Sequence, residues 1–225
     1  MIRVVWASIR ERGFWRTLRI MLSTVADASF DWRYGTDTRR WAELGTLTIK
    51  GDNQAHGVRY VPTRTNAFLK VMDLVPFAEQ SVFVDCGCGK GKVVLLAAQL
   101  PFQRVVGIEF AGQLCELARE NVKQFSTHHP MRPVEICHCD VLDYAFRGDE
   151  NVFFLFDPFD ENILSALLLR IEAHALPPGG FLIYHNPRCR HVLDAAANWM
   201  LRNDITIDGS QFLIYGYLTE EKNVE

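Results

Sequence analysis

The stretch Asp85-Cys86-Gly87-Cys88-Gly89-Lys90-Gly91 decides the fold of this chain. It follows the β-rich run Val82-Phe83-Val84 and precedes a helical pattern over residues 92–100. Glycine alternates with other residues here, and a backbone without side chains can bend sharply and approach a bound small molecule closely. The stretch therefore predicts a strand, a ligand-binding loop and a helix in succession.

Strands and helices alternate on both sides of this loop. Alternation of this kind predicts parallel strands joined by right-handed crossovers, with helices on both faces of the sheet. Near the end, residues 205–207 and 212–215 flank the turn dipeptide Asp208-Gly209, so the last strand should run antiparallel. The predicted fold is α/β, a doubly wound and mostly parallel sheet. Its other strands are expected over 82–84, 104–108, 134–137, 152–156 and 180–184, and its helices over 92–100, 112–125, 161–175 and 191–201.

An acid or an amide follows each of the first five predicted strands, more than a sheet requires for its own stability. In doubly wound sheets, ligands bind at the carboxyl ends of the strands. These side chains are therefore candidate site residues: Asp85, Glu109, Asp140, Asp157 and Asn186.

The spacing of the loop separates three kinds of cofactor. A phosphate-binding P-loop needs a hydroxyl residue where Val93 stands, which excludes it. A dinucleotide fingerprint needs a small residue where Lys92 stands, so this alternative is weak but open. S-adenosylmethionine (SAM) fits better: Asp85 suits its ammonium group, Glu109 its ribose hydroxyls and Asp140 its adenine amine.

Residues 58–218 resemble the class I, Rossmann-like SAM-dependent methyltransferases. The resemblance is carried by the glycine loop, Val106-Gly107-Ile108-Glu109-Phe110, Cys139-Asp140-Val141 and Phe156-Asp157-Pro158-Phe159. It implies a seven-stranded sheet with the last strand antiparallel, SAM as cofactor and S-adenosylhomocysteine as product. It also implies that the cofactor contacts Gly87, Gly89, Gly91 and Val141.

A narrower resemblance concerns Tyr60-Val61-Pro62-Thr63 and the predicted helix over 66–74. This stretch looks like the loop before the first strand in the non-SET protein lysine methyltransferases of the disruptor-of-silencing type. The resemblance implies that Tyr60 and Thr63 hold the methionine end of SAM; the alternative is a simple turn and helix cap. The whole arrangement also resembles uncharacterised bacterial methyltransferases, which fixes no substrate.

Asp157, Pro158 and Phe159 are the candidate catalytic residues. They stand where amine-methylating relatives carry Asn/Asp-Pro-Pro-Tyr/Phe, with one proline fewer, which favours an aliphatic amine over a planar amide or base. His185 is a candidate general base or a structural group at a strand end. The acceptor is an amine or another nucleophile, either a protein lysine or a small molecule such as a glycan precursor. A SAM-sensing adaptor without catalysis and an NAD-dependent oxidoreductase are the alternatives.

The chain divides into an N-terminal extension, 1–57, and a methyltransferase domain, 58–225. Residues 2–25 have the pattern of an amphipathic basic helix that could contact a membrane surface, a partner or its own domain. Trp32, Tyr34 and Trp41 indicate an ordered connector after it. A net charge of -3 argues against a nucleic-acid partner, and the six cysteines indicate reduced thiols in a cytoplasmic protein without a metal site. Nothing here indicates the oligomeric state.

Overall fold

The computed structural model describes residues 14, 27, 29–39, 62–157, 159–173 and 179–218. Apart from Phe14, the predicted helix over 2–25 lies outside these residues, as do Tyr60 and Pro158. The helices are α3 (Thr65–Met72), α4 (Lys92–Ala97), α5 (Gly112–His128), α6 (Glu161–Ala173) and α7 (Arg190–Asp194). The strands are β1 (Val82–Cys86), β2 (Arg104–Glu109), β3 (Val134–His138), β4 (Glu150–Phe156), β5 (Phe181–His185), β6 (Trp199–Ile207) and β7 (Ser210–Tyr217).

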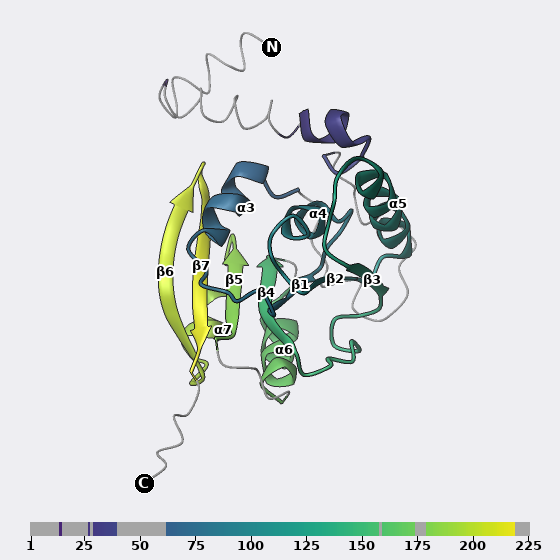
Figure 1. Cartoon of the computed structure of the whole chain (residues 1–225). Helices are drawn as coiled ribbons and strands as arrows, with labels where there is room; N and C mark the ends of the chain where they lie inside the picture. Colours follow the sequence, from purple (N-terminus) through teal and green to yellow (C-terminus); the bar gives the residue numbers. More distant parts are fainter. Residues whose placement is uncertain are drawn as a thin grey trace.

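The sheet has seven strands in the order β3-β2-β1-β4-β5-β7-β6. The strands β1 to β5 are parallel to their neighbours in this group, whereas β7 runs antiparallel to both β5 and β6. Helices α3, α4 and α5 lie on one side of the sheet and α6 on the other (Figure 1). The predicted doubly wound fold with an antiparallel last strand is therefore confirmed.

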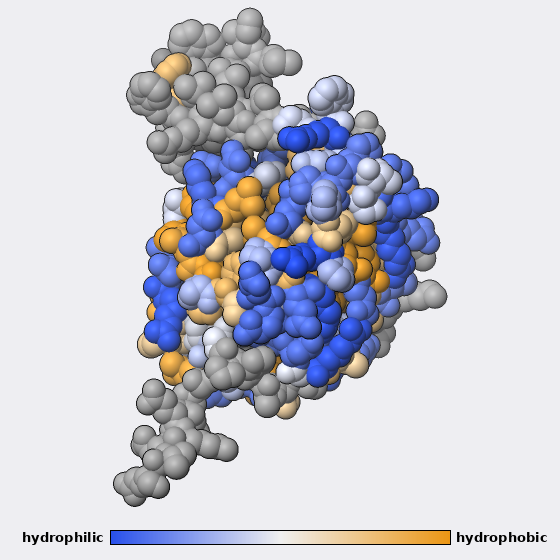
Figure 2. Space-filling model, in the orientation of Figure 1, coloured by the Kyte–Doolittle hydropathy of each residue, from blue (hydrophilic) through white to orange (hydrophobic). Residues whose placement is uncertain are grey.

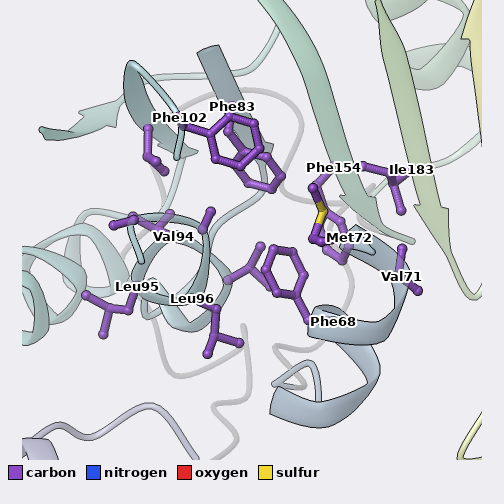
Figure 3. Close-up of a cluster of buried hydrophobic side chains, with 14 of the residues drawn as sticks. Phe68, Val71, Met72, Phe83, Val94, Leu95, Leu96, Phe102, Phe154 and Ile183 are labelled. Carbon is purple, nitrogen blue, oxygen red and sulfur yellow. The ribbon is translucent and has the colours of Figure 1, made fainter. Parts of the chain in front are cut away.

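Each face of the sheet has its own hydrophobic core because successive strand residues point to opposite sides. Phe83 on β1 and Phe154 on β4 pack with α3 and α4, while Val82 and Val84 pack with α6. Figure 3 shows Phe68 of α3 between the side chains of α4 and those of the sheet. The two cores fix the sheet from both sides, so the loops at its carboxyl edge stand on a rigid base.

The helix predicted over 191–201 is wrong beyond Asp194. Helix α7 ends there, and Trp199 begins the strand β6, whose exposure alternates from residue to residue. Trp199 is buried and its indole N–H donates to Glu172 Oε1 at 2.9 Å. The apolar run from Trp199 to Leu201 suits either structure in isolation, and pairing with β7 decides for the strand.

Residues 29–34 are helical and pack against α5, at the top right of Figure 1. The ring centroids of Phe30 and Tyr34 lie 5.8 and 4.4 Å from that of Phe125. Figure 2 shows mostly hydrophilic side chains along the side that carries α5 and apolar patches nearer α3. Within the described residues, no helix is long and apolar enough to cross a membrane.

The close approach of β2 to the glycine loop predicts a cost for any side chain at Gly107. A Cβ there would lie 2.8 Å from Cys88 Sγ and 2.9 Å from Val94 Cγ2, inside a packed core. We expect Gly107→Ala to lower the free energy of unfolding by about 1–3 kcal/mol, measured by urea denaturation. The control Gly112→Ala meets only the exposed ring of His138, at 3.1 Å, and should change stability by less than about 0.5 kcal/mol. Equal stability of the two variants would contradict this packing argument.

Candidate functional site

The glycine loop between β1 and α4 adopts a backbone that favours glycine. Gly87, Gly89 and Gly91 have φ angles of 94°, 54° and 82°, in the left-handed region. At Gly91 a Cβ would also lie 3.3 Å from Ala118 Cβ on α5. The predicted loop residues therefore form a tight turn over the ends of β1 and β2, with no side chain at its three glycine positions.

Glu109 ends β2 and joins this loop to the sheet. Its Oε2 accepts the Gly89 N–H and its Oε1 accepts the Ala111 N–H, both at 2.9 Å. Burial raises the pKa of Glu109, while the backbone N–H groups of Ala111, Gly89 and Phe110 oppose that shift. Each carboxylate oxygen can accept a second hydrogen bond, so contact with ribose hydroxyls remains a prediction compatible with this geometry.

Asp85 at the end of β1 is the most exceptional group of the site. Its side chain is only 3 % exposed, and among the described residues it accepts no hydrogen bond. Burial raises the pKa of Asp85 well above its usual value, and the negative charge of Glu109 adds to the rise. Because an unpaired buried carboxylate is costly, this position is suited to a cationic ligand.

Asp140 and Val141 follow β3, the neighbour of β2 in the sheet. Asp140 Oδ1 accepts the Leu142 N–H at 2.9 Å, which stabilises the turn, and Val141 is buried. The ends of three adjacent strands thus bring Asp85, Glu109 and Asp140 to one edge. The predicted contacts of Asp140 and Val141 with adenine are not tested by this geometry and stay predictions.

Asp157 and Asn186 directly follow β4 and β5 and have φ angles of 42° and 49°. Residues other than glycine rarely adopt this conformation, and such strain gathers at functional sites. The Asp157 carboxylate forms an ion pair with Arg188 and accepts a 3.5 Å hydrogen bond from the Tyr184 hydroxyl. Burial raises the pKa of Asp157, and Arg188 opposes the rise. Phe159, the other described residue of the candidate catalytic motif, is partly buried and packs against the core on the α6 side.

Sequence reasoning missed Arg188 and Tyr184. The signal for Arg188 was its position just after Asn186-Pro187, at the end of the fifth strand. No spacing rule links it to Asp157 on another strand, so the ion pair emerges only once β4 and β5 lie side by side.

His185 is buried between two aromatic rings at the end of β5. Its ring centroid lies 3.8 Å from that of Phe156 and 4.1 Å from that of Phe212, with nearly parallel planes. Thr63 Oγ1 lies 3.4 Å from His185 Nδ1, which brings the predicted cofactor loop to this strand. Within the described chain Nε2 has no hydrogen-bond partner. Burial lowers the pKa of His185 to about 3, so the ring is neutral at pH 7 and a weak base.

Because the His185 imidazole is buried, we expect the free energy of unfolding to fall as the pH falls. The unfolded chain takes up a proton at His185 near pH 6.5, while the folded chain resists it down to about pH 3. The unfolded state thus binds more protons between these values, and stability falls as the pH falls. We expect wild type to lose roughly 2 kcal/mol more than His185→Gln between pH 7.5 and pH 5, measured by urea unfolding. An identical loss in both proteins would show that His185 is accessible to protons.

A family model, a curated relative and solved structures match this chain. The family model "Histone methylation protein DOT1" matches residues 57–157. Trans-aconitate 2-methyltransferase of Azoarcus sp. is 28% identical over 138 residues, which is 61% of this chain. The match spans about half, 51%, of the length of that curated relative.

Two solved structures with S-adenosylhomocysteine share the fold. An RNA methyltransferase from Salinibacter ruber has a TM-score of 0.54 and 22% identity, covering 72% of this chain and 98% of its own. Geranyl diphosphate C-methyltransferase from Streptomyces coelicolor has a TM-score of 0.52 and 16% identity, covering 68% of this chain and 77% of its own.

No group of metal-ligating side chains occurs within the described ranges. The glycine loop, the acids at the strand ends and these matches all support SAM as the cofactor. The chain therefore has the fold of the Rossmann-like methyltransferases, and parts of its sequence are similar to a histone methylation family and to a methyltransferase.

Proposed function

We propose that the edge formed by β1 and β2 binds SAM and that the neighbouring edge formed by β4 and β5 presents a methyl acceptor to it. The observation that carries this proposal is the Asp85 carboxylate, buried and without a hydrogen bond from any described residue. A ligand with an ammonium group would supply both the missing hydrogen bonds and the missing positive charge.

SAM, when bound, would supply a methyl group on its sulfonium: an acceptor lone pair would attack the methyl carbon in line with the breaking C–S bond, S-adenosylhomocysteine would leave, and the acceptor would release a proton. The chain contributes orientation and exclusion of water. Asp85 accepts hydrogen bonds from the ammonium group, and the free lone pairs of Glu109 accept those of the ribose hydroxyls. The glycine loop lets the backbone approach the adenosyl group, because no side chain stands at Gly87, Gly89 or Gly91.

An amine of a protein, such as a lysine, is the acceptor class that we favour. A family model for histone methylation proteins matches the part of the chain that carries the cofactor site. The Asp157 carboxylate, with its raised pKa, could accept an N–H of such an amine and orient the lone pair toward the methyl group. This role requires the amine to compete with Arg188 for Asp157.

A small carboxylic acid is the second candidate acceptor, and Arg188 is the observation that favours it. The Arg188 side chain is 60 % exposed beside Asp157, so its guanidinium is accessible to an anionic substrate. The curated relative named for trans-aconitate methylation agrees with this possibility. Arg188 would then bind the acid, and Asp157 would hold Arg188 in place.

Removal of the Asp85 charge tests the proposed binding of SAM. Asp85→Asn keeps the shape of the side chain but removes the charge that pairs with the ammonium group. We expect SAM affinity, measured by titration calorimetry, to fall roughly 10- to 100-fold, or about 1.5–3 kcal/mol. Asp73→Asn, the same change at an exposed position after α3, should bind SAM like wild type. Unchanged affinity in a folded Asp85→Asn variant would remove Asp85 from the site.

Transfer of a labelled methyl group tests the proposed reaction. We expect the purified protein, given SAM labelled in its methyl group and a cell lysate, to transfer label to the protein fraction. Asp157→Asn should bind SAM normally and lose most of this transfer. Label in new small-molecule products or in nucleic acid, with none in the protein fraction, would exclude the protein-amine acceptor. SAM binding without any transfer or S-adenosylhomocysteine formation would instead favour a sensing or adaptor protein.

A further inference from the structure

Lys90 and Lys92 flank the last glycine of the loop, and residues of the N-terminal segment contact both lysines. Lys90 Nζ lies 3.0 Å from Asp37 Oδ2, and the Lys90 side chain is only 6 % exposed. Lys92 Nζ lies 3.5 Å from the ring centroid of Phe30 and 3.9 Å from Asp27 Oδ1. The predicted roles of the glycine loop use neither lysine, so these contacts call for a separate explanation.

The side chain of Asn121 on α5 joins the main chains of Lys90 and Asp37. Its side-chain N–H groups donate to the Lys90 carbonyl at 3.0 Å and to the Asp37 carbonyl at 3.3 Å. Its Oδ1 accepts the Asp37 N–H at 2.8 Å. Lys90 is thus fixed by its side chain through Asp37 and by its carbonyl through Asn121.

The segment that carries Asp37 is itself well ordered by short-range bonds. Asp31 Oδ1 accepts the hydroxyls of Thr36 and Thr38 at 2.8 and 2.7 Å, and Asp31 Oδ2 accepts the Arg39 N–H at 2.9 Å. The segment also contacts α3, because Asp27 Oδ1 accepts the N–H and the hydroxyl of Thr65 at 2.9 and 2.7 Å. Asp37 therefore approaches the glycine loop from a fixed position.

We propose that Asp37 is a positioning residue for the cofactor site, acting through Lys90 to hold the glycine loop in its binding conformation. The proposal rests on the proposed SAM binding at this loop. A glycine-rich loop has many accessible conformations when unrestrained, and a ligand that selects one of them must overcome that entropy. An ion pair and hydrogen bonds that select the conformation in advance strengthen binding without touching the ligand.

The test compares Asp37→Asn, Lys90→Met and the double variant. We expect each single variant to bind SAM about fivefold to thirtyfold more weakly, the loss that corresponds to restoring freedom to about one residue. The double variant should be no weaker than the singles, since they remove one shared interaction. Asp37→Glu should restore part of the affinity, and Asp73→Asn again serves as the matched control. Additive losses in the double variant would contradict action through Lys90.

Hydrogen exchange of the protein without SAM tests the same proposal independently of the cofactor. The N–H groups of Gly87, Gly89 and Gly91 are bonded to Ile108 O, Glu109 Oε2 and Cys88 O, so their exchange reports opening of the loop. We expect faster exchange over residues 85–91 in Asp37→Asn, with the strands β4 and β5 unchanged.

The outcomes separate the two proposals. Absence of SAM binding in the wild-type protein would refute the proposed function, while the exchange data would still decide whether Asp37 orders the loop. A lower melting temperature in Asp37→Asn with unchanged SAM affinity and unchanged loop exchange would mean that the ion pair only stabilises the fold. That result would overturn the positioning role.

Discussion

Two hydrogen bonds from backbone N–H groups to Glu109 connect the sheet to the loop on which the site depends. They bring Gly89 and Ala111 to the same carboxylate, at 2.9 Å each. Without this carboxylate the buried N–H of Gly89 would lose its partner, and the loop would be bonded to β2 only through the N–H groups of Gly87 and Cys88, which donate to Ile108 O. Glu109 therefore has a structural task whether or not a ligand is present.

Asp85 and Glu109 are both buried acids, but their electrostatic environments differ. The charge of Glu109 is compensated in part by backbone dipoles, whereas the charge of Asp85 receives no such compensation from the described residues. The same edge thus contains one acid that organises the loop and one whose environment is suited to a cationic ligand. Two acids with different environments can divide structural and binding work between them in this way.

The sequence was sufficient for the parts that follow from local pattern. The glycine loop, the acids after the strands and the turn at Asp208-Gly209, with φ angles of 51° and 87°, all depend on residues close together in the chain. The strand at residues 205–207 was predicted, but the first part of β6 was missed because an apolar run such as Trp199 to Leu201 has no decisive period of its own. Its partner β7 supplies the hydrogen bonds that make it a strand.

The contacts that were not foreseen join residues far apart in the sequence. Asp37 with Lys90, Arg188 with Asp157 and Thr63 with His185 each connect two elements whose proximity is set by the packing of the whole sheet. Charge and residue type alone offer many possible partners for each of these groups. The strand order selects Arg188 for Asp157, and the packing of residues 29–39 against α5 selects Asp37 for Lys90.

The insertion of β7 between β5 and β6 has a consequence for how the molecule assembles. During synthesis β6 emerges before β7, yet β7 is its only neighbour in the sheet, and β5 also waits for β7 to cover its outer side. Until that hairpin closes, the nascent chain presents an open row of backbone N–H and C=O groups next to His185. The sheet edge beside the proposed acceptor side is therefore completed only after the half that carries the glycine loop has emerged.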